Sequence, residues 1–114
     1  MFFGSAFELM HASYEDFVVS LGFEWAFWFN NPEWAIPIRA TEAEYLNVIR
    51  PGEKLTIGIS VLKIGESSFS LSFKFQQKGK TACLVKSTHS FLDKKTGQKR
   101  PIPDEIREKL EAIS

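Results

Sequence analysis

Only one stretch of the chain has the spacing of a long helix, and the other long stretches alternate between apolar and polar residues. In the helical stretch, apolar residues recur at three- and four-residue steps from Phe7 to Leu21, and Gly22 can end the helix. Ser5 and Glu8 have the spacing of a capping box, which predicts a helix over Ser5 to Leu21. Its apolar stripe must pack against a sheet, since nothing else in the chain can cover it.

Four stretches have the pattern of β-strands. The first predicted strand covers Ala35 to Tyr45 and contains Pro37, which costs a ladder hydrogen bond and favours a sheet edge or a subunit boundary. Lys78-Gly79 predicts a tight hairpin between the last two strands. Alternation and turn residues predict the remaining strands over Leu55 to Leu62, Ser68 to Phe75 and Thr81 to Leu92.

The segments between these elements complete the predicted fold. Residues Phe23 to Trp34 are dense in aromatic side chains, but Asn30-Asn31-Pro32 breaks a regular element and indicates a loop. Pro103-Asp104 predicts a short terminal helix through Leu110. The order is helix, strand and three-stranded antiparallel meander. We predict an α+β fold in which the sheet wraps the long helix, as a single domain over residues 1–114.

Composition narrows the classes of partner. Fourteen basic residues balance 14 acidic ones, so no net charge attracts a nucleic acid or an anionic membrane. The single cysteine, Cys83, can form no intrachain disulfide, and no window reaches the roughly 18 to 20 apolar residues of a membrane span. We expect a cytoplasmic protein that binds neither nucleic acid nor membrane. The sequence has no metal-ligand spacing or phosphate-binding glycine motif, so we expect no metal or cofactor.

Aromatic residues are more abundant than one small core normally needs, with 11 Phe, 3 Trp and 2 Tyr. Such an excess favours a pocket or a subunit interface. Together with the strand that contains Pro37, it leads us to expect a homo-oligomer of at least two copies.

Three collinear stretches, FELMHASYEDF, AIPIRATEAEYLNVIRPGEKL and SFLDKKTGQKRPIPDEI, resemble the 4-hydroxybenzoyl-CoA thioesterase branch of the hotdog superfamily. Within that branch they look most like 1,4-dihydroxy-2-naphthoyl-CoA hydrolases, and the resemblance covers nearly the whole chain. It implies a hotdog fold, a homodimer or homotetramer, and hydrolysis of an acyl-CoA thioester, for which an aromatic acyl group is a candidate.

The start of the sequence departs from that family. Relatives have a first strand and an Asp-x-x-Gly-type segment, which supplies the catalytic aspartate, just before the positions that match Met1, Phe2 and Phe3. The first strand is therefore missing from this sequence. Either the true start lies upstream, or the chemistry has been lost. We expect residues 1–114 alone to hydrolyse thioesters poorly. The alternative is a non-catalytic acyl-CoA-binding or structural oligomer, and a dehydratase-type hotdog protein is a weaker third reading.

Thioester hydrolysis also needs donors for the oxyanion that develops on the carbonyl oxygen. Free amides at Phe3 and Gly4, at the positive end of the helix dipole, are candidates for this role. The resemblance implies that the Phe3 amide binds the thioester oxygen. The alternative is that Gly4 merely admits the chain to the helix.

His11 lies one turn from Glu8 and from Glu15, so the three can share one helix face. Read from the residues alone, His11 is an ordinary solvated or core histidine. The resemblance instead implies that it orients the acyl group, with Glu15 as a possible assisting base. Tyr14, Trp34 and Ile36 are further candidates for substrate contact. The aromatic residues of the loop form an acyl pocket or pack the dimer interface: Trp25, Phe27, Trp28, Phe29 and Trp34.

Lys63, Ser67 and Ser68 lie near a strand turn where relatives meet the nucleotide end of coenzyme A. The family pattern is more basic there, whereas this chain has Gly65 and Glu66, so the resemblance is weaker at this point. A second group of basic residues could contact the phosphates or simply be solvated: Lys94, Lys95, Lys99 and Arg100.

Overall fold

The computed structural model describes residues 3–50 and 52–114, and the side chains of residues 9–50 and 52–114. Its long helix, α1, spans Phe3–Ser20, and Gly22 follows it with a φ of 95°, as expected for a residue that ends a helix. The helix starts two residues before its predicted start. Ser5 therefore lies inside α1, and its predicted role as the N-cap is wrong. The side chains of Ser5 and Glu8 lie outside the described residues.

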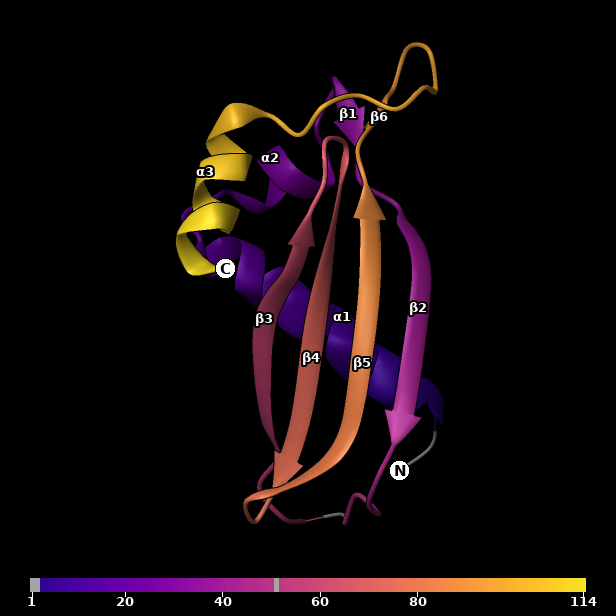
Figure 1. Cartoon of the computed structure of the whole chain (residues 1–114), viewed down its shortest axis with the longest axis vertical. Coiled ribbons are helices and arrows are strands. Elements are labelled where there is room, and N and C mark those ends of the chain that lie inside the picture. Colours follow the sequence, from indigo (N-terminus) through magenta and orange to yellow (C-terminus); the bar gives the residue numbers. More distant parts are fainter. Residues whose placement is uncertain (1–2, 51) are drawn as a thin grey trace.

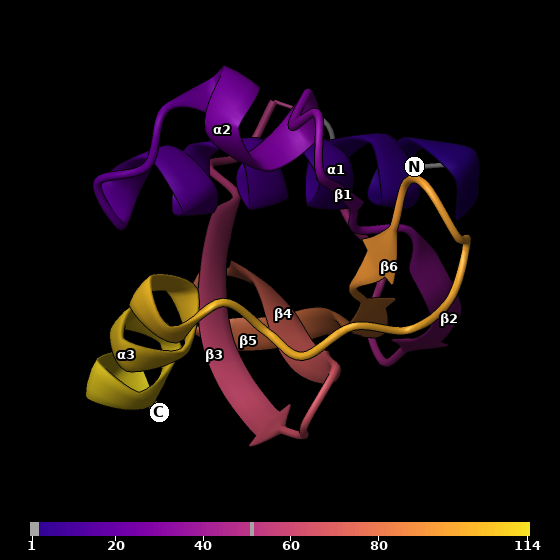
Figure 2. The same cartoon turned by 90° about the horizontal axis from the view of Figure 1, so that it is seen from above.

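A four-stranded antiparallel sheet covers one side of α1, as Figures 1 and 2 show. Its strand order is β2-β5-β4-β3, so the predicted meander of the last three strands is confirmed. The strands are β2 (Ile38–Tyr45), β3 (Thr56–Ile64), β4 (Ser68–Gln77) and β5 (Lys80–Ser90).

Apolar and polar residues alternate strictly along β4, and this alternation explains what the strand contributes to the core. Its apolar residues face α1 and are at most 1% exposed, whereas the serines between them are half-buried on the opposite face. A strand alternates in this way because successive side chains point to opposite sides of the sheet. The four apolar residues of β4 are Phe69, Leu71, Phe73 and Phe75.

The first predicted strand is in fact two strands. β1 (Trp34–Ala35) pairs with β6 (Leu92–Asp93) in a small separate sheet, and β2 starts at Ile38. Pro37 lies in the break between β1 and β2, where its lack of an amide hydrogen breaks no ladder bond. The prediction of an edge strand is confirmed, since β2 is the first strand of its sheet.

Two short helices complete the fold. The predicted aromatic loop contains α2 (Trp25–Phe29), a correction to the prediction, and the tertiary packing of Trp28 stabilises this single turn. The predicted terminal helix is confirmed as α3 (Asp104–Ile113), which lies beside β3. Arg107 of α3 donates a hydrogen bond of 2.7 Å to the carbonyl of Gly65 and so fixes the β3–β4 turn. No helix in the described part of the chain is long and apolar enough to cross a membrane.

Candidate active site

The start of α1 is the predicted oxyanion-binding site. Phe3 and Gly4 are the first two residues of the helix, and the first turn contains no acidic residue. The first four amides of a helix have no acceptor within the helix, and the helix dipole makes this end positive. The backbone here can therefore donate hydrogen bonds to a developing oxyanion, whereas the first turn offers no carboxylate as nucleophile or base.

His11 and Glu15 share the exposed face of α1. The His11 Nε2 atom lies 4.0 Å from Glu15 Oε1, and the two side chains are 57% and 37% exposed. Trp25 of α2 donates a hydrogen bond of 3.1 Å from Nε1 to the same Glu15 oxygen. Both side chains are open to a ligand, but one oxygen of Glu15 is already bonded, which weakens its role as a free base.

Tyr14 lies on the opposite, buried face of α1. It is 3% exposed, and its hydroxyl accepts a hydrogen bond of 2.7 Å from Trp28 Nε1. Burial raises the pKa of Tyr14, and the bond from Trp28 partly opposes that rise. We predicted that Tyr14 contacts the substrate. Within one chain the surrounding core covers its ring, so the ring is not exposed to a ligand.

His89 on β5 is a buried polar residue that the sequence pattern did not single out. Its ring is stacked between Tyr14, at 4.6 Å between centroids, and Phe69, at 4.9 Å. Nε2 lies 2.7 Å from the hydroxyl of Ser87, and Nδ1 has no hydrogen-bond partner among the described residues. Burial lowers the pKa of His89 to about 4, with a smaller contribution from His11. His89 is therefore neutral near pH 7.

Trp34 is packed inside the protein. It is 5% exposed and contacts Phe27 at 5.2 Å and Phe91 at 6.1 Å between ring centroids. The guanidinium of Arg100 lies 5.4 Å from the ring centroid of Trp34, close enough for a cation–π contact. Ile36, between β1 and β2, is half-buried. Within one chain, Trp34 packs the core instead of lining an open acyl pocket.

The predicted CoA-binding residues lie at the β3–β4 turn. Lys63 is exposed and borders a pocket of about 200 Å³, and Ser67 and Ser68 are half-buried. The amide of Phe91 donates a hydrogen bond of 2.8 Å to the carbonyl of Ser67, which fixes the turn. Figure 1 shows this turn well away from the start of α1, so one chain does not bring the two predicted groups together. In the second basic group, Arg100 packs on Trp34, whereas three lysines are exposed: Lys94, Lys95 and Lys99.

Comparison with known proteins gives a consistent result. Residues 3–110 match the Thioesterase-like superfamily. A 1,4-dihydroxy-2-naphthoyl-CoA hydrolase from Acaryochloris marina is 27% identical over 109 residues, which cover 93% of this chain and 80% of that protein.

Solved structures agree with this match. A protein from Prochlorococcus marinus, provisionally described as a thioesterase, superposes with a TM-score of 0.93 at 26% identity, over 100% of this chain and 84% of its own. A 1,4-dihydroxy-2-naphthoyl-CoA thioesterase from Synechocystis has a TM-score of 0.88 at 13% identity, over 96% of this chain and 82% of its own. At that identity, the second likeness supports the fold alone.

Proposed function

Because the chain belongs to the Thioesterase-like superfamily and has a hotdog fold, we propose that it hydrolyses an acyl-CoA thioester with an aromatic acyl group. The match over residues 3–110 is the observation on which this rests. The aromatic acyl group is inferred from relatives such as the hydrolase of Acaryochloris marina. Equal amounts of free acid and CoA thiol, formed from the thioester and water, would support the proposal. Thiol release without free acid would contradict hydrolysis.

The proposed mechanism uses the amides at the start of α1. Water adds to the thioester carbon, negative charge develops on the carbonyl oxygen, and the amides of Phe3 and Gly4 stabilise that charge. The carbon–sulfur bond then breaks and CoA leaves as the thiolate, which takes up the proton removed from the water, so the products are a carboxylic acid and the CoA thiol. A general base must activate the water, and the first turn of α1 contains no carboxylate that could do so.

That missing carboxylate favours a second candidate function. A protein that binds acyl-CoA without hydrolysing it needs a binding site for the thioester and amide donors for its carbonyl oxygen. It needs no base to activate water. Glu15 is the carboxylate beside His11, and its Oε1 already accepts a bond from Trp25. Thioester binding without CoA release would support this alternative.

We propose that His11 orients the acyl group and does not take part in the chemistry. It lies eight residues after Phe3, about 12 Å along the axis at roughly 1.5 Å per residue. We expect His11→Ala to weaken discrimination in favour of a hydroxylated aryl thioester by about 1–3 kcal/mol, because a buried hydroxyl loses its partner. Simple aliphatic thioesters should be little affected, as measured by kcat/KM. An equal loss on both substrate classes would instead assign His11 to catalysis or to the fold.

We further propose that two or more copies assemble. β2 is an edge strand, and large apolar side chains on and just after it are exposed, among them Ile38 at 40% and Leu46 at 47%. We expect light scattering at micromolar concentration to give at least twice the mass of one chain, and Leu46→Asp to shift the population towards monomer. Ile113→Asp, at 47% exposure on α3, is the matched control. A wild-type monomer would contradict the assembly.

A further inference from the structure

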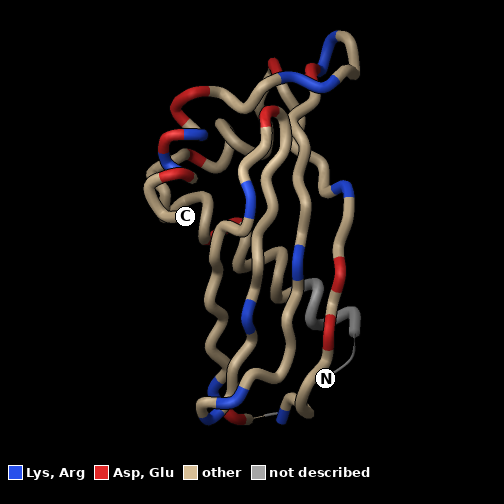
Figure 3. The backbone as a smooth tube through the Cα atoms, viewed as in Figure 1, with Lys and Arg blue, Asp and Glu red and all other residues tan. Residues whose placement is uncertain are grey.

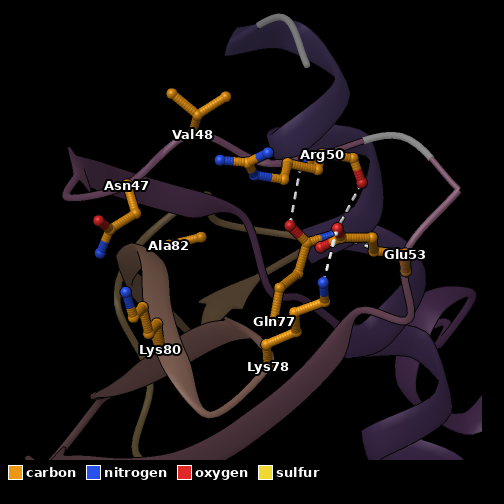
Figure 4. Close-up of a pocket in the computed structure, with 8 residues that line it drawn as sticks. All are labelled: Asn47, Val48, Arg50, Glu53, Gln77, Lys78, Lys80 and Ala82. Carbon is orange, nitrogen blue, oxygen red and sulfur yellow. Dashed lines mark hydrogen bonds and ion pairs between the residues drawn. The ribbon is translucent and has the colours of Figure 1, made fainter.

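A pocket of about 460 Å³ lies where the loop after β2 meets the β4–β5 hairpin, and Figure 4 shows the residues that line it. This volume is within the usual range of small-molecule sites, roughly 300–1,000 Å³. The lining contains none of the residues that we assign to thioester binding or hydrolysis. The pocket therefore shares no lining residue with the candidate active site, although Figure 1 shows the loop after β2 at the same end of the sheet as the start of α1.

Gln77 holds the backbone of this pocket in place. It is 8% exposed, and its Oε1 accepts a hydrogen bond of 2.8 Å from the amide of Arg50. Its Nε2 donates to the carbonyl of Arg50 at 3.0 Å and to that of Glu53 at 3.4 Å. On the other side, Asn47 Nδ2 donates to the carbonyl of Thr81 at 2.8 Å. All of these hydrogen bonds involve backbone groups of Arg50, Glu53 and Thr81. None of them involves the guanidinium of Arg50.

The charges of the pocket do not balance. Three cations, Arg50, Lys78 and Lys80, line it together with one carboxylate, Glu53, a formal charge of +2 in a chain whose net charge is zero. Lys78 Nζ lies 3.2 Å from Glu53 Oε1, so that carboxylate is already neutralised. Among the described residues, no ion pair involves the side chains of Arg50 and Lys80. Figure 3 shows basic positions gathered at this end of the sheet.

We propose that this pocket binds a phosphate group. A free guanidinium can donate two parallel hydrogen bonds to phosphate oxygens, and a free ammonium adds a second positive charge. Val48, 79% exposed at the rim, offers apolar contact to the organic part of a phosphate ester. The phosphate can belong to an organic ligand, such as a nucleotide, or can be the free ion.

Calorimetric titration with inorganic phosphate and with adenosine 3′,5′-bisphosphate tests the proposal. We expect Arg50→Gln with Lys80→Gln to weaken binding at least tenfold, because two charge-assisted contacts are lost. We expect Glu53→Gln to tighten it severalfold, because Lys78 is released and a repelling carboxylate is removed. A purely structural role would not predict the second effect. The matched control is Lys74→Gln, an exposed cation of β4 outside the pocket.

The two probes identify the source of the phosphate. Tighter binding of the bisphosphate by tenfold or more indicates an organic phosphate, whereas equal binding indicates the free ion, and both support a phosphate site. Binding that survives the double substitution but is lost in Lys63→Gln would overturn the assignment to this pocket, as would no binding at millimolar concentration. If the double variant does not fold, each single variant should still bind about threefold more weakly. The titration involves no turnover, so its outcome is independent of thioester hydrolysis.

Discussion

Replacing Trp28 with alanine is expected to lower the free energy of unfolding by about 3–5 kcal/mol. Trp28 is 2% exposed and packs against Phe69 and Phe91, with ring centroids 6.0 and 6.3 Å away. Its Nε1 also bonds the hydroxyl of Tyr14. The substitution therefore opens a cavity between α1, α2 and the sheet and removes a buried hydrogen bond. Urea denaturation at fixed protein concentration measures the loss.

Two controls separate packing from hydrogen bonding. Trp25→Ala removes a 51% exposed ring of the same helix and should cost less than about 1 kcal/mol. Trp28→Phe and Tyr14→Phe each remove one partner of the buried bond, and each should cost about 1–3 kcal/mol. The double variant should cost less than the sum of the two. A loss for Trp28→Ala no greater than that for Trp25→Ala would contradict the described packing.

Stability should fall as the pH is lowered, because His89 resists protonation in the folded state. Its folded pKa is about 4, whereas its ordinary value is 6.5. Between these pH values the unfolded chain binds a proton that the folded chain does not, so protons favour unfolding. The stability is fully present above about pH 6.5 and is lost towards pH 4. The gap between the two pKa values corresponds to about 3 kcal/mol at most.

His89→Phe isolates this contribution. Phenylalanine can stack between Tyr14 and Phe69 but cannot titrate, so the pH dependence from His89 should disappear. Unfolding free energies between pH 7.5 and 4 in both proteins give the difference. The same slope in the two proteins would show that His89 is not the group responsible.

Sequence reasoning worked best where local pattern and tertiary environment agree. β4 alternates strictly because one of its faces is core and the other is not, so its pattern alone predicts the strand. α3 has a proline start and buried residues at helical spacing, Ile106 and Leu110. In both elements, the positions that are apolar in the sequence pattern are the positions that are buried in the fold.

Long-range contacts account for what the sequence could not predict. α2 is too short to form alone and depends on contacts of Trp28 with residues more than 40 positions away. The burial of His89 depends on Tyr14 lying above it, which follows from the docking of α1 and not from the pattern of β5. The phosphate pocket likewise joins Arg50 to a hairpin 27 residues later through Gln77. Each feature requires the assembled fold.

The most direct test of the proposed function is the kcat/KM for 1,4-dihydroxy-2-naphthoyl-CoA relative to an aliphatic acyl-CoA of similar size. The appropriate material is protein isolated from its own cells, together with residues 1–114 produced alone. We predict that the cellular protein releases CoA from the aromatic thioester at least about tenfold more efficiently, since pocket contacts give differences of roughly this size. A cellular protein that binds the thioester but releases no CoA would contradict hydrolysis.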